Sequence, residues 1–233
     1  MLAASAKVYR YVDEVGKDGW IQGLKEGPAG VLIPMCKYTK VLMLDTAKGR
    51  TRFTVQDGTY AGVTLSMKEE NAKKYLGTLA PLNKLAQVAV NYGKYEEHWW
   101  SQARSLELDQ QFATLKVSTI TATVTMNSVW GTGFTPLPIG SYNIRVPDVP
   151  HAGNMTTYYS SVAPGLMHDQ VWFPIEYGDN SRYVHVGNIS DGCTTVVDIG
   201  KWASICEALV SHRSDDGKLV GKLIVTGKPE RAK

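Results

Sequence analysis

Residues 118–126 read Ser-Thr-Ile-Thr-Ala-Thr-Val-Thr-Met, and this stretch decides the fold of the second half of the chain. Threonine alternates with apolar residues from Thr119 to Met126. An alternation with a period of two residues predicts a β-strand with one buried face. Leu115 and Val117 keep the opposite phase, so we expect a bulge or break near Ser118.

The pattern of short strands continues beyond this stretch. Four further strands are predicted, over residues 142–146, 170–176, 181–186 and 218–226. One helix is predicted to begin at Asp198, which is a favourable N-cap residue. Its apolar stripe consists of Trp202, Ile205, Cys206 and Leu209. The second half is therefore expected to be mainly β.

The first half is expected to contain both strands and helices. Short β-like runs separated by turn residues occur over 7–12, 31–34, 40–45 and 51–55. From Ser66 to about Phe112 we expect two or three helices instead. Ser66 and Glu69 have the spacing of a capping box, and the apolar residues from Leu82 onward recur at near-helical spacing.

Composition and length limit the class of protein. The chain has 233 residues, with 43% hydrophobic and 20% charged residues, as in an ordinary globular protein. Its net charge of +3 is too small to indicate nucleic-acid binding. No apolar run reaches the roughly eighteen residues of a membrane-spanning helix. The start of the chain as given shows no export signal, although Ala4-Ser5-Ala6 is similar to a cleavage site.

We therefore predict an α+β fold class with two regions. Residues 1–112 form an α+β N-terminal region with a targeting or binding role. Residues 113–233 form a mainly β domain of sandwich or barrel type, which is expected to carry the chemistry.

The segment from Tyr183 to Thr194, Tyr-Val-His-Val-Gly-Asn-Ile-Ser-Asp-Gly-Cys-Thr, is the best candidate for a catalytic site. Cys193 follows a glycine in a polar loop, where packing gives little reason for a thiol. His185 shares a strand face with Tyr183 and lies eight residues before the cysteine. A nearby imidazole would lower the pKa of the thiol and return its proton to a leaving group.

The other two cysteines have simpler explanations. Cys206 lies on the apolar stripe of the predicted helix, and Cys36 is expected to be a strand residue. No two cysteines have the spacing of metal ligands, so we expect no metal site.

Two motifs resemble a known family. Ser190-x-Gly192-Cys193 with His185 upstream is similar to the Ser-x-Gly-Cys signature of L,D-transpeptidase (YkuD-type) catalytic domains. The stretch 135–144, Thr-Pro-Leu-Pro-Ile-Gly-Ser-Tyr-Asn-Ile, is similar to the Thr-Pro-x-Gly entry of that family. The resemblance covers about residues 113–227 and is that of a divergent member.

The resemblance implies a bacterial cysteine acyltransferase that modifies the cell wall, active in the periplasm or after secretion and without a cofactor. Its substrates would be peptidoglycan stem peptides, cleaved before a terminal D-amino acid through a thioester that passes to an amine or to water. Cys193 would be the nucleophile and His185 the base. Gly192 would help hold the oxyanion, and Ser190 and Asp191 would support the loop. The predicted substrate-binding residues are Tyr183, Gly187, Asn188 and Thr194.

Other interpretations remain open. A papain-like cysteine amidase or endopeptidase would use His212, which follows Cys193 in the chain. A non-catalytic cell-wall-binding or phage structural module would keep the fold without the activity. The aromatic pairs Trp99-Trp100 and Tyr158-Tyr159 could stack on sugar rings or fill the wall of a core or groove.

Overall fold

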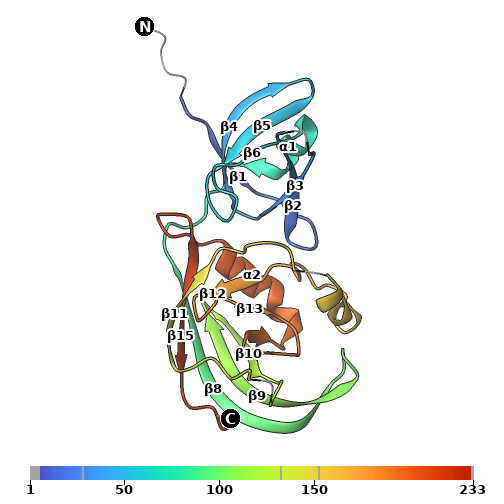
Figure 1. The fold of residues 1–233 in the computed structure, drawn as a ribbon, viewed down its shortest axis with the longest axis vertical. Coiled ribbons are helices and arrows are strands. Elements are labelled where there is room, and N and C mark those ends of the chain that lie inside the picture. Colours follow the sequence, from blue (N-terminus) through green and yellow to red (C-terminus); the bar gives the residue numbers. More distant parts are fainter. Residues whose placement is uncertain (1–5, 28, 132, 152, 232–233) are drawn as a thin grey trace.

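The computed structural model describes residues 6–231 except 28, 132 and 152, so the cleavage-like Ala4-Ser5-Ala6 lies mostly outside the described residues. Strands make up 45% of the chain and helices 12%, in two sheets. Figure 1 shows the first sheet at one end of the long axis of the molecule and the second sheet at the other end. The mainly β character predicted for the second half is confirmed.

The first sheet has seven strands in the order β3-β2-β6-β5-β4-β1-β7. Its buried core includes Val41, Phe53 and Leu65, which are fully buried. One short helix, α1 (Glu69–Tyr75), follows β6. The strands are β1 (Tyr9–Val12), β2 (Trp20–Lys25), β3 (Leu32–Cys36), β4 (Lys40–Ala47), β5 (Arg50–Val55), β6 (Thr64–Lys68) and β7 (Leu76–Gly77).

The second sheet is a closed barrel in the order β10-β14-β13-β12-β11-β15-β8-β9. Helix α2 (Trp202–Val210) packs its apolar stripe into the barrel core. Three 3₁₀ turns are η1 (Gly153–Met155), η2 (Thr157–Ser161) and η3 (Ile199–Lys201). The strands are β8 (Ala86–Ser101), β9 (Leu106–Val117), β10 (Ile120–Asn127), β11 (Gly140–Arg145), β12 (Phe173–Ile175), β13 (Arg182–Val186), β14 (Thr194–Val196) and β15 (Leu219–Thr226).

Most predicted strands are confirmed. The alternating threonine stretch is β10, which pairs with β9 across a turn at Ser118, where φ is +52°. The four later strands correspond to β11, β12, β13 and β15. The predicted final helix is α2, but Asp198 does not cap it. Its carboxylate instead accepts hydrogen bonds from the Thr123 N–H and from Lys201.

The prediction of two or three helices between residues 66 and 112 is wrong except for α1. Ser66 lies within β6 and makes no cap, and the two long strands β8 and β9 occupy most of the segment. In β8 the residues from Ala86 to Gly93 alternate strictly between buried and exposed. That alternation has the period of a strand, and its valines are β-branched residues that favour one.

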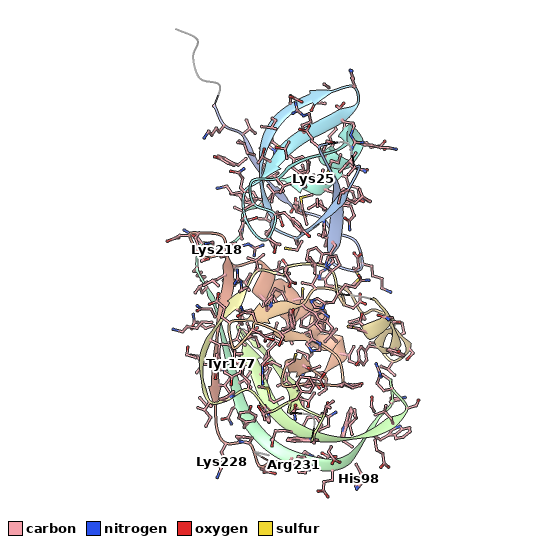
Figure 2. The ribbon with its side chains drawn as sticks, in the orientation of Figure 1. Lys25, His98, Tyr177, Lys218, Lys228 and Arg231 are labelled. Atoms are coloured by element: carbon pink, nitrogen blue, oxygen red, sulfur yellow. The ribbon has the colours of Figure 1, made fainter. Side chains whose placement is uncertain are left out.

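The boundary expected at residue 112 falls inside β9. The change from the first sheet to the barrel occurs between Gly77 and Ala86, because β8 already pairs with β15 of the barrel. The hairpin of β8 and β9 curves along the barrel, and His98 near its tip lies at the end remote from the first sheet (Figure 2).

Side chains from both sheets meet at their junction. Glu207 on α2 accepts hydrogen bonds from Tyr38 at 2.7 Å and from Lys37 at 3.1 Å. Asp57 lies 3.6 Å from Arg213, and both side chains are buried. The barrel core also includes Trp20, Cys36 and Tyr38 of the first sheet. The two sheets therefore share one hydrophobic core at their contact. Within the described ranges, no helix has the length and apolar character needed to cross a membrane.

Candidate active site

The candidate site is built on two adjacent strands of the barrel. β13 and β14 run parallel, with Val184 opposite Thr194. Parallel neighbours usually need a connection of a dozen or more residues, whereas here residues 187–193 connect them. This short crossover places Cys193 beside Tyr183, whose N–H donates to the Cys193 sulfur at 3.4 Å.

The loop that presents Cys193 is held by side chains on both sides. Ser190 Oγ donates to the Cys193 carbonyl at 2.8 Å, and the Ser190 N–H donates to Ser128 Oγ at 2.6 Å. Arg182 Nη1 donates to the Gly192 carbonyl at 3.0 Å and to the Thr135 carbonyl at 2.7 Å. Arg182 therefore joins the two motifs on which the family resemblance rests.

Gly192 is required at its position by geometry. Its φ is +83°, a conformation that side-chain-bearing residues rarely adopt. A Cβ there would also lie 2.5 Å from the Thr135 carbonyl oxygen and would clash with the Arg182 guanidinium. The absence of a side chain is thus what allows this loop to close against residue 135.

Four of the predicted site residues line a single cavity of about 780 Å³, namely Cys193, His185, Tyr183 and Asp191. Sequence reasoning did not identify several other lining residues, among them Arg182, Arg104 and Trp172. Tyr158 and Tyr159, considered above for sugar stacking, line the same cavity. The structure thus brings the candidate nucleophile and base to one space.

The imidazole of His185 is fixed by three contacts. Its ring stacks on Trp172, with 3.9 Å between the ring centroids. Nδ1 lies 2.9 Å from the Val186 carbonyl, and Nε2 lies 3.0 Å from Thr195 Oγ1. A carbonyl only accepts hydrogen bonds, so Nδ1 carries the proton and Thr195 donates to Nε2. Nε2 is therefore the basic nitrogen.

His185 and Cys193 make no hydrogen bond to each other among the contacts of the described residues, so the expected direct pair is not formed. The expectation of a lowered thiol pKa is also wrong. Burial raises the pKa of Cys193 to about 11, against the opposing effect of the Tyr183 N–H. Burial lowers the pKa of His185 to about 4. Both groups are therefore neutral at pH 7.

His151 extends the aromatic group around the base. Its ring also stacks on Trp172, with centroids 4.1 Å apart, and meets Tyr183 edge-on at 4.8 Å. Its Nε2 lies 3.7 Å from a carboxylate oxygen of Asp148. The two rings are brought together by a backbone contact between loop segments, in which the His151 N–H donates to the Gln170 carbonyl at 3.1 Å, and local sequence does not reveal such a contact.

Three predicted substrate-binding residues lie outside this cavity. In β14 the side chain of Thr194 points opposite to those of its neighbours, and its buried hydroxyl has no hydrogen-bond partner among the described residues. Gly187 is packed against Tyr159. Asn188 lines a second, separate cavity. The prediction that these residues contact substrate in the catalytic cavity is not supported by their positions.

His212, which the papain-like alternative needs, does not line the cavity that holds Cys193. Its backbone pairs instead with Leu82 near the junction of the sheets. Within the part of the chain that is described, no group of three or more His, Cys, Asp or Glu side chains could hold a metal ion.

Comparisons with known protein families, curated proteins and solved structures gave no significant match. The interpretation of the site therefore depends on its own residues and geometry.

Proposed function

We propose that this protein is a cysteine acyltransferase of the L,D-transpeptidase type that acts on peptidoglycan stem peptides. The observation that carries the proposal is that two residues line one cavity, Cys193 from the loop directly before β14 and His185 from the neighbouring parallel strand β13. The Ser-x-Gly-Cys loop and the Thr-Pro segment, which resemble that family, meet at the same cavity through Arg182.

In the proposed reaction, His185 Nε2 takes the proton of the Cys193 thiol, and the sulfur attacks the carbonyl carbon that precedes the terminal D-amino acid. The C–N bond breaks, and the imidazolium returns the proton to the leaving amine. The thioester then passes to an amine, which gives a cross-link or exchange, or to water. Because Nε2 is bonded to Thr195 at rest, substrate binding must draw the imidazole and thiol together.

The charges around the cavity suit a peptide that carries both amine and carboxylate groups. Arg182 and Arg104 line it together with Asp179 and Asp191. The guanidinium of Arg104 lies 4.2 Å from the Tyr158 ring centroid, so an aromatic face holds one of these cations in place. Carboxylates of a stem peptide would find both arginines within the cavity.

The proposal is tested by turnover of purified stem peptides and intact sacculi. Cys193→Ala should reduce turnover by roughly a thousandfold or more, because a nucleophile has no substitute. Cys206→Ala is the matched control, since this thiol is buried on α2 away from the cavity. It should retain turnover. Equal turnover by the wild type and Cys193→Ala would reject the enzyme proposal.

A second candidate is a cell-wall-binding module without catalysis. The observation that favours it is that a neutral Cys193 thiol and a neutral His185 imidazole make no hydrogen bond to each other among the described contacts. This candidate predicts that the wild type binds sacculi but produces no cleaved or cross-linked peptide, and that Cys193→Ala binds equally well.

A further inference from the structure

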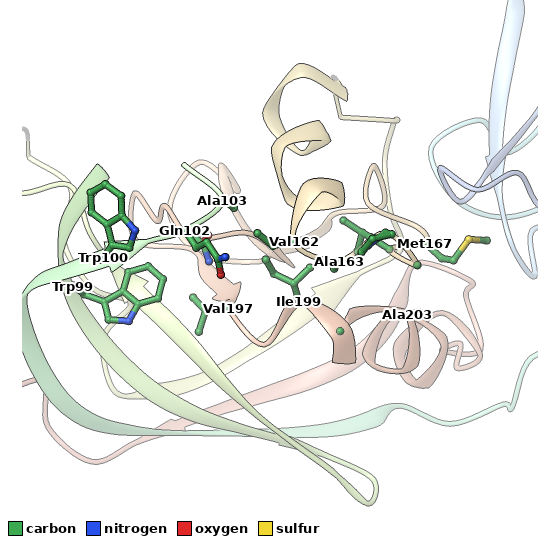
Figure 3. Close-up of a pocket in the computed structure, with 15 residues that line it drawn as sticks. Trp99, Trp100, Gln102, Ala103, Val162, Ala163, Met167, Val197, Ile199 and Ala203 are labelled. Carbon is green, nitrogen blue, oxygen red and sulfur yellow. The ribbon is translucent and has the colours of Figure 1, made fainter. Parts of the chain in front are cut away.

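A second cavity, of about 680 Å³, is lined by residues of the barrel domain (Figure 3). We name it the tryptophan groove. One wall is formed by Trp99 and Trp100 at the end of β8 and by Gln102 in the connection to β9, and the other is the segment 162–167 after η2. The floor is formed by η3 and the start of α2. Its volume is within the range of about 300–1,000 Å³ that is typical of ligand sites.

The lining of the tryptophan groove is uncharged. Its residues include no Asp, Glu, Lys, Arg or His. Figure 3 shows the Gln102 amide within the groove, and this amide makes no hydrogen bond that the structure describes. An uncharged lining does not favour an anionic polymer or a charged peptide, since neither would find a counter-charge there.

The two tryptophans make the groove suitable for a ring with apolar faces. Trp100 is 57% exposed, which is a large apolar surface to leave in water. Trp99 is held edge-on against Phe112, with centroids 5.8 Å apart. The electron-rich face of an indole packs on the C–H face of a pyranose ring, while an amide such as Gln102 can bind its hydroxyl or acetamido groups.

The groove and the catalytic cavity share a wall. Asn188 lines the groove, and its N–H donates at 2.9 Å to the hydroxyl of Tyr159, which lines the catalytic cavity. The segment that follows Tyr159 then forms the far side of the groove. A polymer with a stem peptide in the catalytic cavity would therefore have its backbone next to the tryptophans.

We infer that the tryptophan groove binds a neutral β-linked N-acetylhexosamine chain, which is the sugar backbone of peptidoglycan. This inference depends on the proposed function for the choice of sugar. It gives Trp99-Trp100 a role in the barrel domain itself, and not in a separate N-terminal targeting region.

The test uses the full chain carrying Cys193→Ala, so that no turnover occurs. The probe is the β-1,4-linked hexasaccharide of N-acetylglucosamine, which has no stem peptide. Calorimetry and tryptophan fluorescence should show saturable binding, and adding Trp100→Ala should weaken it at least tenfold. Adding Trp100→Phe should restore part of the affinity. Ile224→Ala is the control, because Ile224 is 41% exposed on β15 and lines none of the cavities described here.

Absence of saturable binding at millimolar hexasaccharide would overturn the inference, as would equal affinity after Trp100→Ala. Binding of an apolar peptide in its place would overturn it as well. If Trp100→Ala fails to fold, Gln102→Leu replaces it and should also weaken binding. Stem-peptide turnover by the wild type, together with no hexasaccharide binding, rejects the groove alone. Hexasaccharide binding, together with no stem-peptide turnover by the wild type, rejects the proposed enzyme function alone.

Discussion

At the scale of single residues, both the Cys193 thiol and the His185 imidazole are neutral at pH 7. Forming the Cys193 thiolate in the free protein is unfavourable, because burial raises the thiol pKa to about 11. Burial likewise lowers the pKa of His185 to about 4, so its imidazole is neutral where it stacks on Trp172 and bonds to Thr195. Under the proposed function, substrate binding would have to make the proton transfer favourable, for example by displacing Thr195 from Nε2.

The buried neutral imidazole predicts a specific dependence of stability on pH. The pKa of His185 falls from 6.5 in the unfolded chain to about 4 in the folded protein. Between these two pH values the unfolded state binds the proton and the folded state does not. The stability that the neutral, buried imidazole contributes is therefore full above pH 6.5 and is lost as the pH drops from 6.5 toward 4. The loss should reach roughly 3 kcal/mol of unfolding free energy. Urea denaturation should show this fall for the wild type and a smaller one for His185→Phe, which keeps an aromatic ring beside Trp172.

His98→Gln is the matched control, because its side chain is 76% exposed. It should leave the pH dependence as in the wild type. An identical fall of stability for the wild type and His185→Phe between pH 6.5 and 4 would contradict the buried neutral state of His185.

At the scale of single elements, the catalytic loop depends on Gly192. Replacing it with alanine forces a Cβ into the space of Thr135 and Arg182 at a φ of +83°. Gly192→Ala should therefore lower the unfolding free energy by about 1–3 kcal/mol and abolish turnover. Gly62→Ala is the control for backbone strain without a steric clash. Gly62 has a φ of +87°, but no atom lies within 4 Å of the position that a Cβ would take. An equal loss of unfolding free energy in both variants would show that the clash with Thr135 adds nothing to the effect of backbone strain at Gly192.

Strand β8 shows why part of the fold was mispredicted from sequence. The spacing of Leu82, Leu85 and Val88 suggested a helix, but the first two lie before the strand begins at Ala86. The correct signal was the alternation of Ala86, Val88, Val90 and Tyr92, all buried. The alternation in β10 was recognised because its other face is uniformly threonine. In β8 the exposed positions carry residues of several different types, so the same two-residue period is harder to recognise.

The candidate site was predicted only in part for a similar reason. The glycine before Cys193 and the shared face of Tyr183 and His185 are local features that the sequence contains. Trp172 reaches His185 because β12, which begins at the next residue, pairs with β13, whereas Arg104 comes from the distant connection between β8 and β9. The direction of the pKa shifts also depends on burial, which local sequence does not reveal.

At the scale of the whole molecule, the barrel cannot be separated at residue 112. A fragment that begins at residue 113 lacks β8 and most of β9, which pair with β15 and β10 respectively. We expect it to lack a cooperative unfolding transition, because the barrel cannot close and its core is exposed. Circular dichroism during urea denaturation measures this, with the full chain as control. A cooperatively folding fragment would contradict the barrel topology.

The proposed function requires Cys193 to be an acylating nucleophile within this cavity. The most direct measurement is the intact mass of the full chain after incubation with a carbapenem, because a Cys193 thiolate formed by proton transfer to His185 would open the strained lactam and remain acylated. We predict one adduct per chain, located on Cys193, absent from Cys193→Ala and retained in Cys206→Ala. No adduct on the wild type, or an adduct on Cys36 or Cys206 in its place, would contradict the account.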